Sequence, residues 1–203
     1  MKNPIRRSRN IGKTQGGRVK GGRAYEKWNR SGYLHNIYAQ LSDSNDTWQL
    51  FKDNPSKSYF HPCEGGEYFN VLRKLPGELT SYVKAIILPR MSKYDERYAV
   101  EAKRRYDCII MNPFPKNMKM VWSYKPVKAV FRHYEPWCNH WKNIGKSSVL
   151  LWEYDEVRRY YLYHLFLHEL GHINQPRFHS LNRREEFAEN FALEWARHLG
   201  KLA

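Results

Sequence analysis

Three residues near the C-terminus, His168, Glu169 and His172, have the types and spacing of a zinc site. In a helix, His168 and His172 lie about 6 Å apart along the axis on one face, so both imidazoles can bind one Zn²⁺. Glu169 lies about 100° around the helix from His168, where it can reach a water bound to the ion. Such a carboxylate can act as the general base in metal-assisted hydrolysis of a peptide bond. The spacing therefore predicts zinc ligands at His168 and His172 and a catalytic base at Glu169.

The predicted helix around these residues, 156–174, is apolar almost all round, which is typical of a buried helix. Burying two imidazoles and a carboxylate without partners would cost several kcal/mol, on the order of a usual desolvation penalty, and a metal with its water would satisfy all three. His164 lies about 12 Å along the axis from His172, so we expect it to support the site rather than to bind the same ion. Gly171 costs about 1 kcal/mol relative to alanine in a helix, and a close approach of another segment would explain it.

Zinc in a catalytic site needs a third protein ligand, and a second predicted helix, 183–199, offers carboxylates. We expect Glu185 to be this ligand, and Glu189, one turn later, to accept a hydrogen bond from a ligating histidine. Glu186, Glu189 and His179 remain alternatives for the third ligand. Glu185 could instead complete a capping box with Asn182. Alanines on the same stripe as Glu185 would let the two helices come close; they are Ala188, Ala192 and Ala196.

The HELGH motif at 168–172, followed by Glu185, Ala188 and Glu189 in an ExxAE pattern, resembles the gluzincin metallopeptidases. More narrowly, it is similar to the ImmA/IrrE-type peptidases and to the minimal catalytic core of the HtpX-type ones. The resemblance covers residues 155–199, under a quarter of the chain. It implies a zincin-like fold, one Zn²⁺ per chain held by His168, His172 and Glu185, and a supporting role for Glu189. It also implies that an edge strand near the site holds a protein or peptide substrate by β-addition.

The elements that must position the site are predicted strands in the middle of the chain and predicted helices in its last third. Apolar runs that end at Pro, Asn or Asp predict strands, and residues 92–105 look helical. In the last third, Asp155 is the expected N-cap of helix 156–174, Pro176 stops it, and Gly200 ends the second helix. We therefore expect an α+β fold: a small, mostly antiparallel sheet packed on the buried HExxH helix and on a second C-terminal helix. The predicted strands are 81–88, 106–111, 119–124, 128–134 and 147–153.

The net charge of +15 on 203 residues is concentrated at the N-terminus, where residues 1–30 hold ten Lys or Arg and one Glu. We interpret residues 1–24 as a flexible basic arm, with non-specific nucleic acid as a candidate partner, and residues 25–203 as the metallopeptidase domain. No apolar run approaches the roughly 20 residues of a membrane span. The first 30 residues contain no apolar segment, so we expect no secretory signal there. The three distant cysteines, Cys63, Cys108 and Cys138, favour a reducing compartment, so we expect a cytoplasmic protein.

A second function class remains open: a non-enzymatic nucleic-acid-binding protein with a structural zinc. It rests on the basic arm and on aromatic residues near it, Trp28, Tyr33, Tyr38 and Trp48, that could stack on bases. A third hypothesis combines both functions in a peptidase that acts near nucleic acid. His133, Cys138 and His140 are candidates for another metal site, although their spacing matches no standard zinc pattern. Candidate donors to an oxyanion are Tyr124, His133, Tyr154 and Arg158.

Overall fold

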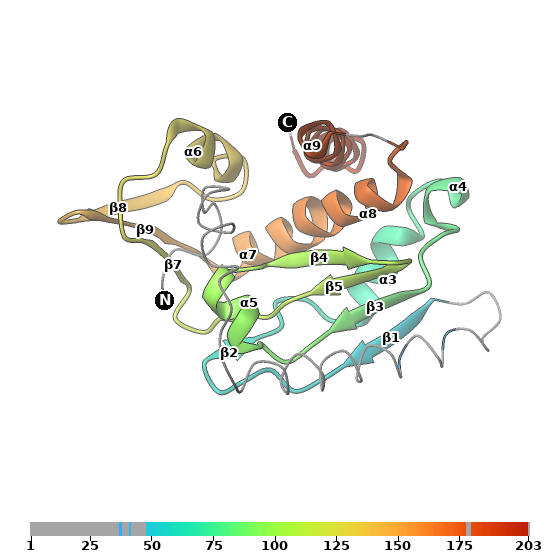
Figure 1. The fold of residues 1–203 in the computed structure, drawn as a ribbon, viewed down its shortest axis with the longest axis horizontal. Helices are drawn as coiled ribbons and strands as arrows, with labels where there is room; N and C mark the ends of the chain where they lie inside the picture. Colours follow the sequence, from blue (N-terminus) through green and yellow to red (C-terminus); the bar gives the residue numbers. More distant parts are fainter. Residues whose placement is uncertain (1–36, 38–40, 42–47, 178–179, 203) are drawn as a thin grey trace.

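The computed structural model describes residues 37, 41, 48–177 and 180–202, and Figure 1 shows their arrangement. The described residues form several helices and three small sheets, so the predicted α+β class is confirmed. The predicted basic arm, residues 1–24, lies outside the described residues, and so does His179. Within the described part, no helix is both long and apolar enough to cross a membrane.

The largest sheet has four strands in the order β1-β3-β5-β4 (Figure 1). Strand β1 (Gln49–Lys52) is parallel to β3 (Ala85–Leu88), which is parallel to β5 (Cys108–Met111); only the edge strand β4 (Ala102–Arg105) is antiparallel to its neighbour. The expectation of a mostly antiparallel sheet is therefore wrong for this sheet. The reason is visible in β3 and β5, whose residues are all buried, as in parallel strands covered on both faces.

Both faces of this sheet carry apolar side chains. On one face, alternate residues of β3 and β5 pack into the main core with α3 (Gly65–Leu72). Both α3 and the short helix α4 (Gly77–Thr80) lie between β1 and β3 in the sequence. The opposite face is covered by Ile37 and Leu41. The residues on that face are Phe51, Ala85, Ile87, Cys108 and Ile110.

The segment 92–105 was predicted to be helical, and this prediction is wrong in its second half. Helix α5 (Lys93–Tyr98) begins at Ser92, whose side chain accepts the Asp95 backbone N–H, and it ends at Ala99 in the left-handed conformation. The chain then runs as strand β4. The polar sequence of β4 follows from its place at the sheet edge, where Arg104 and Arg105 are exposed.

Asp95 is completely buried and links α5 to β4, because its carboxylate accepts hydrogen bonds from Ser92 Oγ at 2.9 Å and Lys103 Nζ at 2.8 Å. We expect Asp95→Ala to lower the free energy of unfolding by about 3 kcal/mol, since a half-buried lysine loses its counter-charge. Chemical denaturation measures this loss. The control is Asp107→Ala, whose mostly exposed pair with Lys84 should contribute less than about 1 kcal/mol. Equal effects of the two substitutions would contradict the structural role of Asp95.

A second sheet is antiparallel and has the order β7-β9-β8, with β7 (Lys119–Trp122), β9 (Ser147–Leu151) and β8 (His140–Ile144). Strand β9 therefore lies in the centre of this sheet, with a paired strand on each side, so it offers no free edge to a substrate. The segment 128–134 was predicted as a strand but forms helix α6 (Lys128–Tyr134), in which Val130 and Tyr134, one turn apart, are buried. A short pair, β2 (Tyr59–Phe60) and β6 (Phe114–Pro115), completes the sheets.

The HExxH segment belongs to one long helical run. Helix α7 (Tyr154–Tyr160) starts with a capping box between Glu153 and Glu156 rather than at Asp155, and it continues through a π-helical turn, η1 (Tyr161–Leu165), into α8 (Phe166–Asn174). Gln175 is extended, as expected for a residue that precedes proline. The predicted end before Pro176 is confirmed.

The last helix, α9 (Leu181–His198), begins two residues before the predicted start. Its N-cap is Ser180, so Asn182 lies inside the helix and cannot form the capping box that was the alternative use of Glu185. The predicted end is confirmed, because Gly200 has a φ of +66° and the Lys201 N–H bonds to the Ala196 carbonyl. Figure 1 shows α8 between the edge strand β4 and α9.

Candidate metal centre

A close contact between α8 and α9 brings the two halves of the site together. Ala188, Ala192 and Ala196 are fully buried along α9. Opposite them, a Cβ atom at Gly171 would lie only 3.0 Å from Ala188 Cα and 3.1 Å from Phe191 Cβ. The glycine and the alanine stripe therefore let the helix backbones approach, which places the carboxylates of α9 opposite the histidines of α8.

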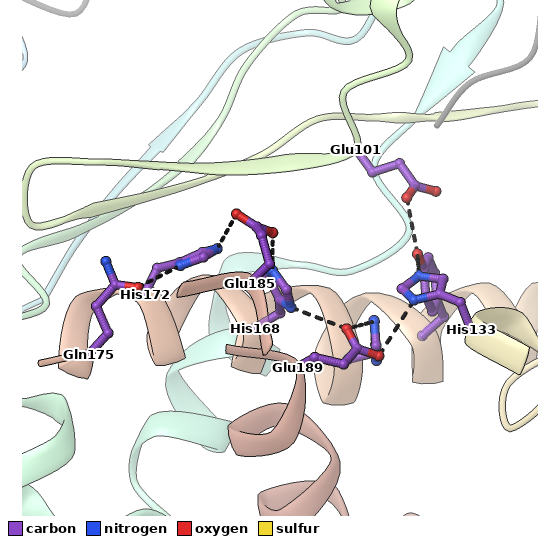
Figure 2. A network of polar contacts seen from close by, with 9 residues as sticks. Glu101, His133, His168, His172, Gln175, Glu185 and Glu189 are labelled. Atoms are coloured by element: carbon purple, nitrogen blue, oxygen red, sulfur yellow. Dashed lines mark hydrogen bonds and ion pairs between the residues drawn. The ribbon is translucent and has the colours of Figure 1, made fainter. Parts of the chain in front are cut away.

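His168, His172 and Glu185 converge at this contact, as Figure 2 shows. His168 Nε2 lies 3.5 Å from Glu185 Oε2, and His172 Nε2 lies 3.6 Å from Glu185 Oε1. Two ligand atoms at about 2.0–2.1 Å from a tetrahedral zinc are about 3.3–3.4 Å apart, close to these separations. Two imidazoles and one carboxylate are also a donor set that zinc prefers, so the three residues fit one ion.

The second nitrogen of each histidine also faces a polar partner. His168 Nδ1 lies 3.4 Å from Glu189 Oε2, as the sequence predicted for Glu189, and His172 Nδ1 lies 3.1 Å from Gln175 Oε1. Such partners fix the ring orientation and leave Nε2 to bind a metal. Gln175 was not predicted from the sequence; its place directly after α8, one turn beyond His172, is the signal that could have indicated it.

The charges of the site are strongly coupled. Burial lowers the pKa of His168, but hydrogen bonds to Glu185 and Glu189 outweigh it and raise the pKa to about 9. The same hydrogen bond to His168, and one to His172, holds the pKa of Glu185 well below its usual value. Burial also opposes ionisation of Glu189, yet hydrogen bonds to His133 and His168 lower its pKa. The carboxylates thus favour positive charge at the histidines, which either a proton or a metal ion can supply.

Glu169 has a different environment from the two ligand carboxylates. Its side chain is only 8% exposed, and it belongs to neither group of metal-ligating side chains found among the described residues. Burial raises the pKa of Glu169 more than the charges of His168 and His172 and a hydrogen bond from the Arg104 backbone lower it. A buried carboxylate with a raised pKa, next to two candidate ligands, has the properties of a proton acceptor.

A cleft of about 440 Å³ opens over these residues. One wall is the segment from Tyr98 to Arg104, which includes most of the edge strand β4, and the floor carries the histidines of α8. Sequence reasoning did not indicate this wall, because the basic sequence of β4 looks helical. Basic side chains line the cleft at Lys103, Arg104 and Arg184.

The four residues considered as oxyanion donors do not line this cleft in the described part of the chain. The Tyr154 hydroxyl is directed to the Pro62 carbonyl at 3.5 Å, and Arg158 pairs with Glu67. His133 lies 3.2 Å from the Tyr160 hydroxyl. The expectation that one of Tyr124, His133, Tyr154 and Arg158 faces the substrate is therefore not supported by their positions.

The other candidates also have defined positions. Glu186 is exposed on α9, outside both ligand groups of the described residues. Cys138 donates to the Leu151 carbonyl and His140 pairs with Glu156, so these two do not form the candidate metal site with His133.

Trp48, one of the aromatic residues that could stack on bases, stacks on Phe69, with ring centroids 6.0 Å apart. All three cysteines are buried and free.

Comparison with known proteins provides no identity for this arrangement. No family model, no curated protein and no solved structure matches the chain, so its function has to be inferred from the residues of the site themselves.

Proposed function

We propose that this chain is a zinc-dependent metallopeptidase of the zincin type. The observation that carries the proposal is the convergence of His168, His172 and Glu185 at separations that suit one zinc ion, beside the buried carboxylate of Glu169 and under an open cleft. The resemblance of HELGH and the ExxAE pattern to gluzincins points to the same activity.

His168, His172 and Glu185 would hold the zinc ion. When bound, zinc lowers the pKa of a water ligand to about 7 and polarises a carbonyl oxygen. Glu169 then accepts a proton on its carboxylate during hydrolysis and returns it to the leaving amine. Its burial supports this role, because a carboxylate shielded from solvent takes up a proton more readily than an exposed one.

Strand β4 is the proposed binding edge for an extended peptide. It pairs with β5 on one side, and no described strand pairs with its other side. It also lines the cleft over α8, and the Arg104 backbone bonds to Glu169. A peptide added to this edge would gain main-chain hydrogen bonds and would pass close to Glu169 and the histidines.

The alternative of a structural zinc in a nucleic-acid-binding protein has less support. Structural zinc sites usually use four protein ligands, whereas this group contains three and borders a cleft. The basic arm at residues 1–24 stays a candidate nucleic-acid contact, and it is compatible with a peptidase that acts near nucleic acid. A salt titration of DNA binding, with and without residues 1–24, tests that role.

The metal proposal is tested with Glu185→Gln, which keeps the size of the side chain but removes its charge. We expect this variant to retain one zinc fewer per chain than the wild type after dialysis, and to lose peptide hydrolysis. Elemental analysis measures the bound zinc, and cleavage of a mixed peptide library measures peptide hydrolysis. The matched control is Glu186→Gln, one residue away and exposed, which should keep both properties. Full zinc retention in Glu185→Gln would overturn the ligand assignment.

A further inference from the structure

A second group of ligand-type side chains lies directly beside the first, at His133, His164 and Glu189. These residues come from α6, η1 and α9, three elements that are far apart in the sequence. His133 Nδ1 lies 3.5 Å from Glu189 Oε1, and His164 Nε2 lies 3.6 Å from Glu189 Oε2. These separations are almost the same as those in the first group, so by the same tetrahedral geometry the three residues fit one ion.

The hydrogen bonds around His133 indicate which of its nitrogens can bind a cation. The Tyr160 hydroxyl donates its hydrogen to Glu101 Oε2 at 3.0 Å, so the Tyr160 oxygen acts as the acceptor for His133 Nε2 at 3.2 Å. A neutral His133 therefore carries its hydrogen on Nε2. Its Nδ1 then points a lone pair toward the Glu189 carboxylate, and two acceptors at this distance need a positive charge between them.

His133 and its partners have the arrangement that is usual for a metal-ligating histidine. In such sites, one ring nitrogen binds the metal while the other donates to an oxygen that is itself hydrogen-bonded, which fixes the tautomer. Here Tyr160 is that oxygen, and Glu101 orders it. A proton on Nδ1 is the competing way to supply the positive charge, and counting bound metal separates the two.

His164 is held firmly in this group. It is 1% exposed and stacks on Tyr160, with ring centroids 5.2 Å apart and planes 14° apart. His164 lies in the π-helical turn η1, and turns of this kind inside α-helices occur frequently at functional sites. The residue also lines the cleft, which gives an ion a path from solvent.

We propose that His133, His164 and Glu189 bind a second divalent transition-metal ion, with zinc as the expected ion. The ion would join α6 to η1 and α9. It would also fix the Glu189 carboxylate, whose Oε2 atom lies 3.4 Å from His168 Nδ1 and so orients a ligand of the first group. This second site goes beyond the proposed function, because it binds metal whether or not the first site hydrolyses peptides.

The test counts zinc in the full chain after dialysis against metal-free buffer. We expect two zinc ions per chain in the wild type, one in His133→Phe, one in Glu185→Gln, and none in the double variant. Phenylalanine replaces the imidazole, which contacts Tyr134 and Tyr160, by another aromatic ring that has no nitrogen to bind a metal. The control is His140→Gln, an exposed histidine on β8, which should keep two ions. His133→Phe with as much zinc as the wild type, or a wild type whose only zinc is lost in Glu185→Gln, would overturn the proposal.

A second measurement decides the question if His133→Phe does not fold. Co²⁺ replaces Zn²⁺ in nitrogen and oxygen sites and absorbs visible light, so it can be titrated into the metal-free wild type. We expect the absorbance to rise until two equivalents have been added. Saturation of the wild type at one equivalent, together with no absorbance change in Glu185→Gln, would show that His133 and Glu189 share a proton instead of a metal. Because Glu185→Gln removes only the first site, the two proposals fail separately.

Discussion

Replacing Glu169 by glutamine is expected to lower the rate of peptide hydrolysis by about 10²–10⁴-fold, the usual contribution of a general base. The amide is close in size to the carboxylate but cannot accept the proton. Zinc content should stay that of the wild type, because Glu169 belongs to neither ligand group of the described residues. The loss should therefore appear in kcat rather than in metal binding.

The measurement combines kcat and KM for a cleaved peptide with zinc analysis of the same sample. Glu78→Gln is a suitable control, since Glu78 is an exposed glutamate on α4, and it should keep full activity. Unfolding curves of Glu169→Gln check that the buried amide has not disturbed the core. Hydrolysis at the wild-type rate by a zinc-loaded Glu169→Gln would exclude the proposed base.

The C-terminal helices could be predicted from the sequence because local signals define them. The apolar run of α8, the proline after it and the glycine after α9 each act within a few residues of the helix end. Helix α6 and strand β4 were predicted wrongly for a common reason. The short segment KAVFRHY contains β-branched and aromatic residues although it forms a helix, and AKRR is polar although it forms an edge strand. In both segments, packing against the rest of the chain determines the secondary structure and overrides the local preference of the residues.

The residues of the candidate site also divide into those that local sequence signals predict and those that only tertiary packing brings together. His168, Glu169, His172, Glu185 and Glu189 follow from helical spacing, because each helix repeats its faces every three to four residues. His133 does not follow from spacing, since only the packing of α6 against η1 brings it to Glu189. The cleft wall also depends on the order of strands in the sheet, which places β4 at the edge. Sequence periodicity thus identifies candidate ligands within helices but not those that tertiary contacts add.

The substitution with the largest expected effect on the architecture of the site is Gly171→Val. The new side chain would enter the space where α8 and α9 touch, with Ala188 Cα only 3.0 Å from its Cβ. Since this neighbour is backbone, it can move only if the whole of α9 moves. We expect the free energy of unfolding to fall by about 3 kcal/mol, as for other overpacked cores. Retained zinc should also fall, because the shift carries Glu185 and Glu189 away from the histidines.

Gly66→Val provides the matched control, because Gly66 is also a helical glycine, in α3, but a Cβ atom there meets nothing within 4 Å. The free energy of unfolding should change by no more than about 0.5 kcal/mol at this exposed position. Valine is, if anything, a slightly better helix former than glycine, so a loss at Gly171 cannot come from helix propensity. It must come from the contact between the helices. Denaturation curves of the two variants measure the difference, and equal stability would mean that α8 and α9 are too far apart for Glu185 to share a metal with His168 and His172.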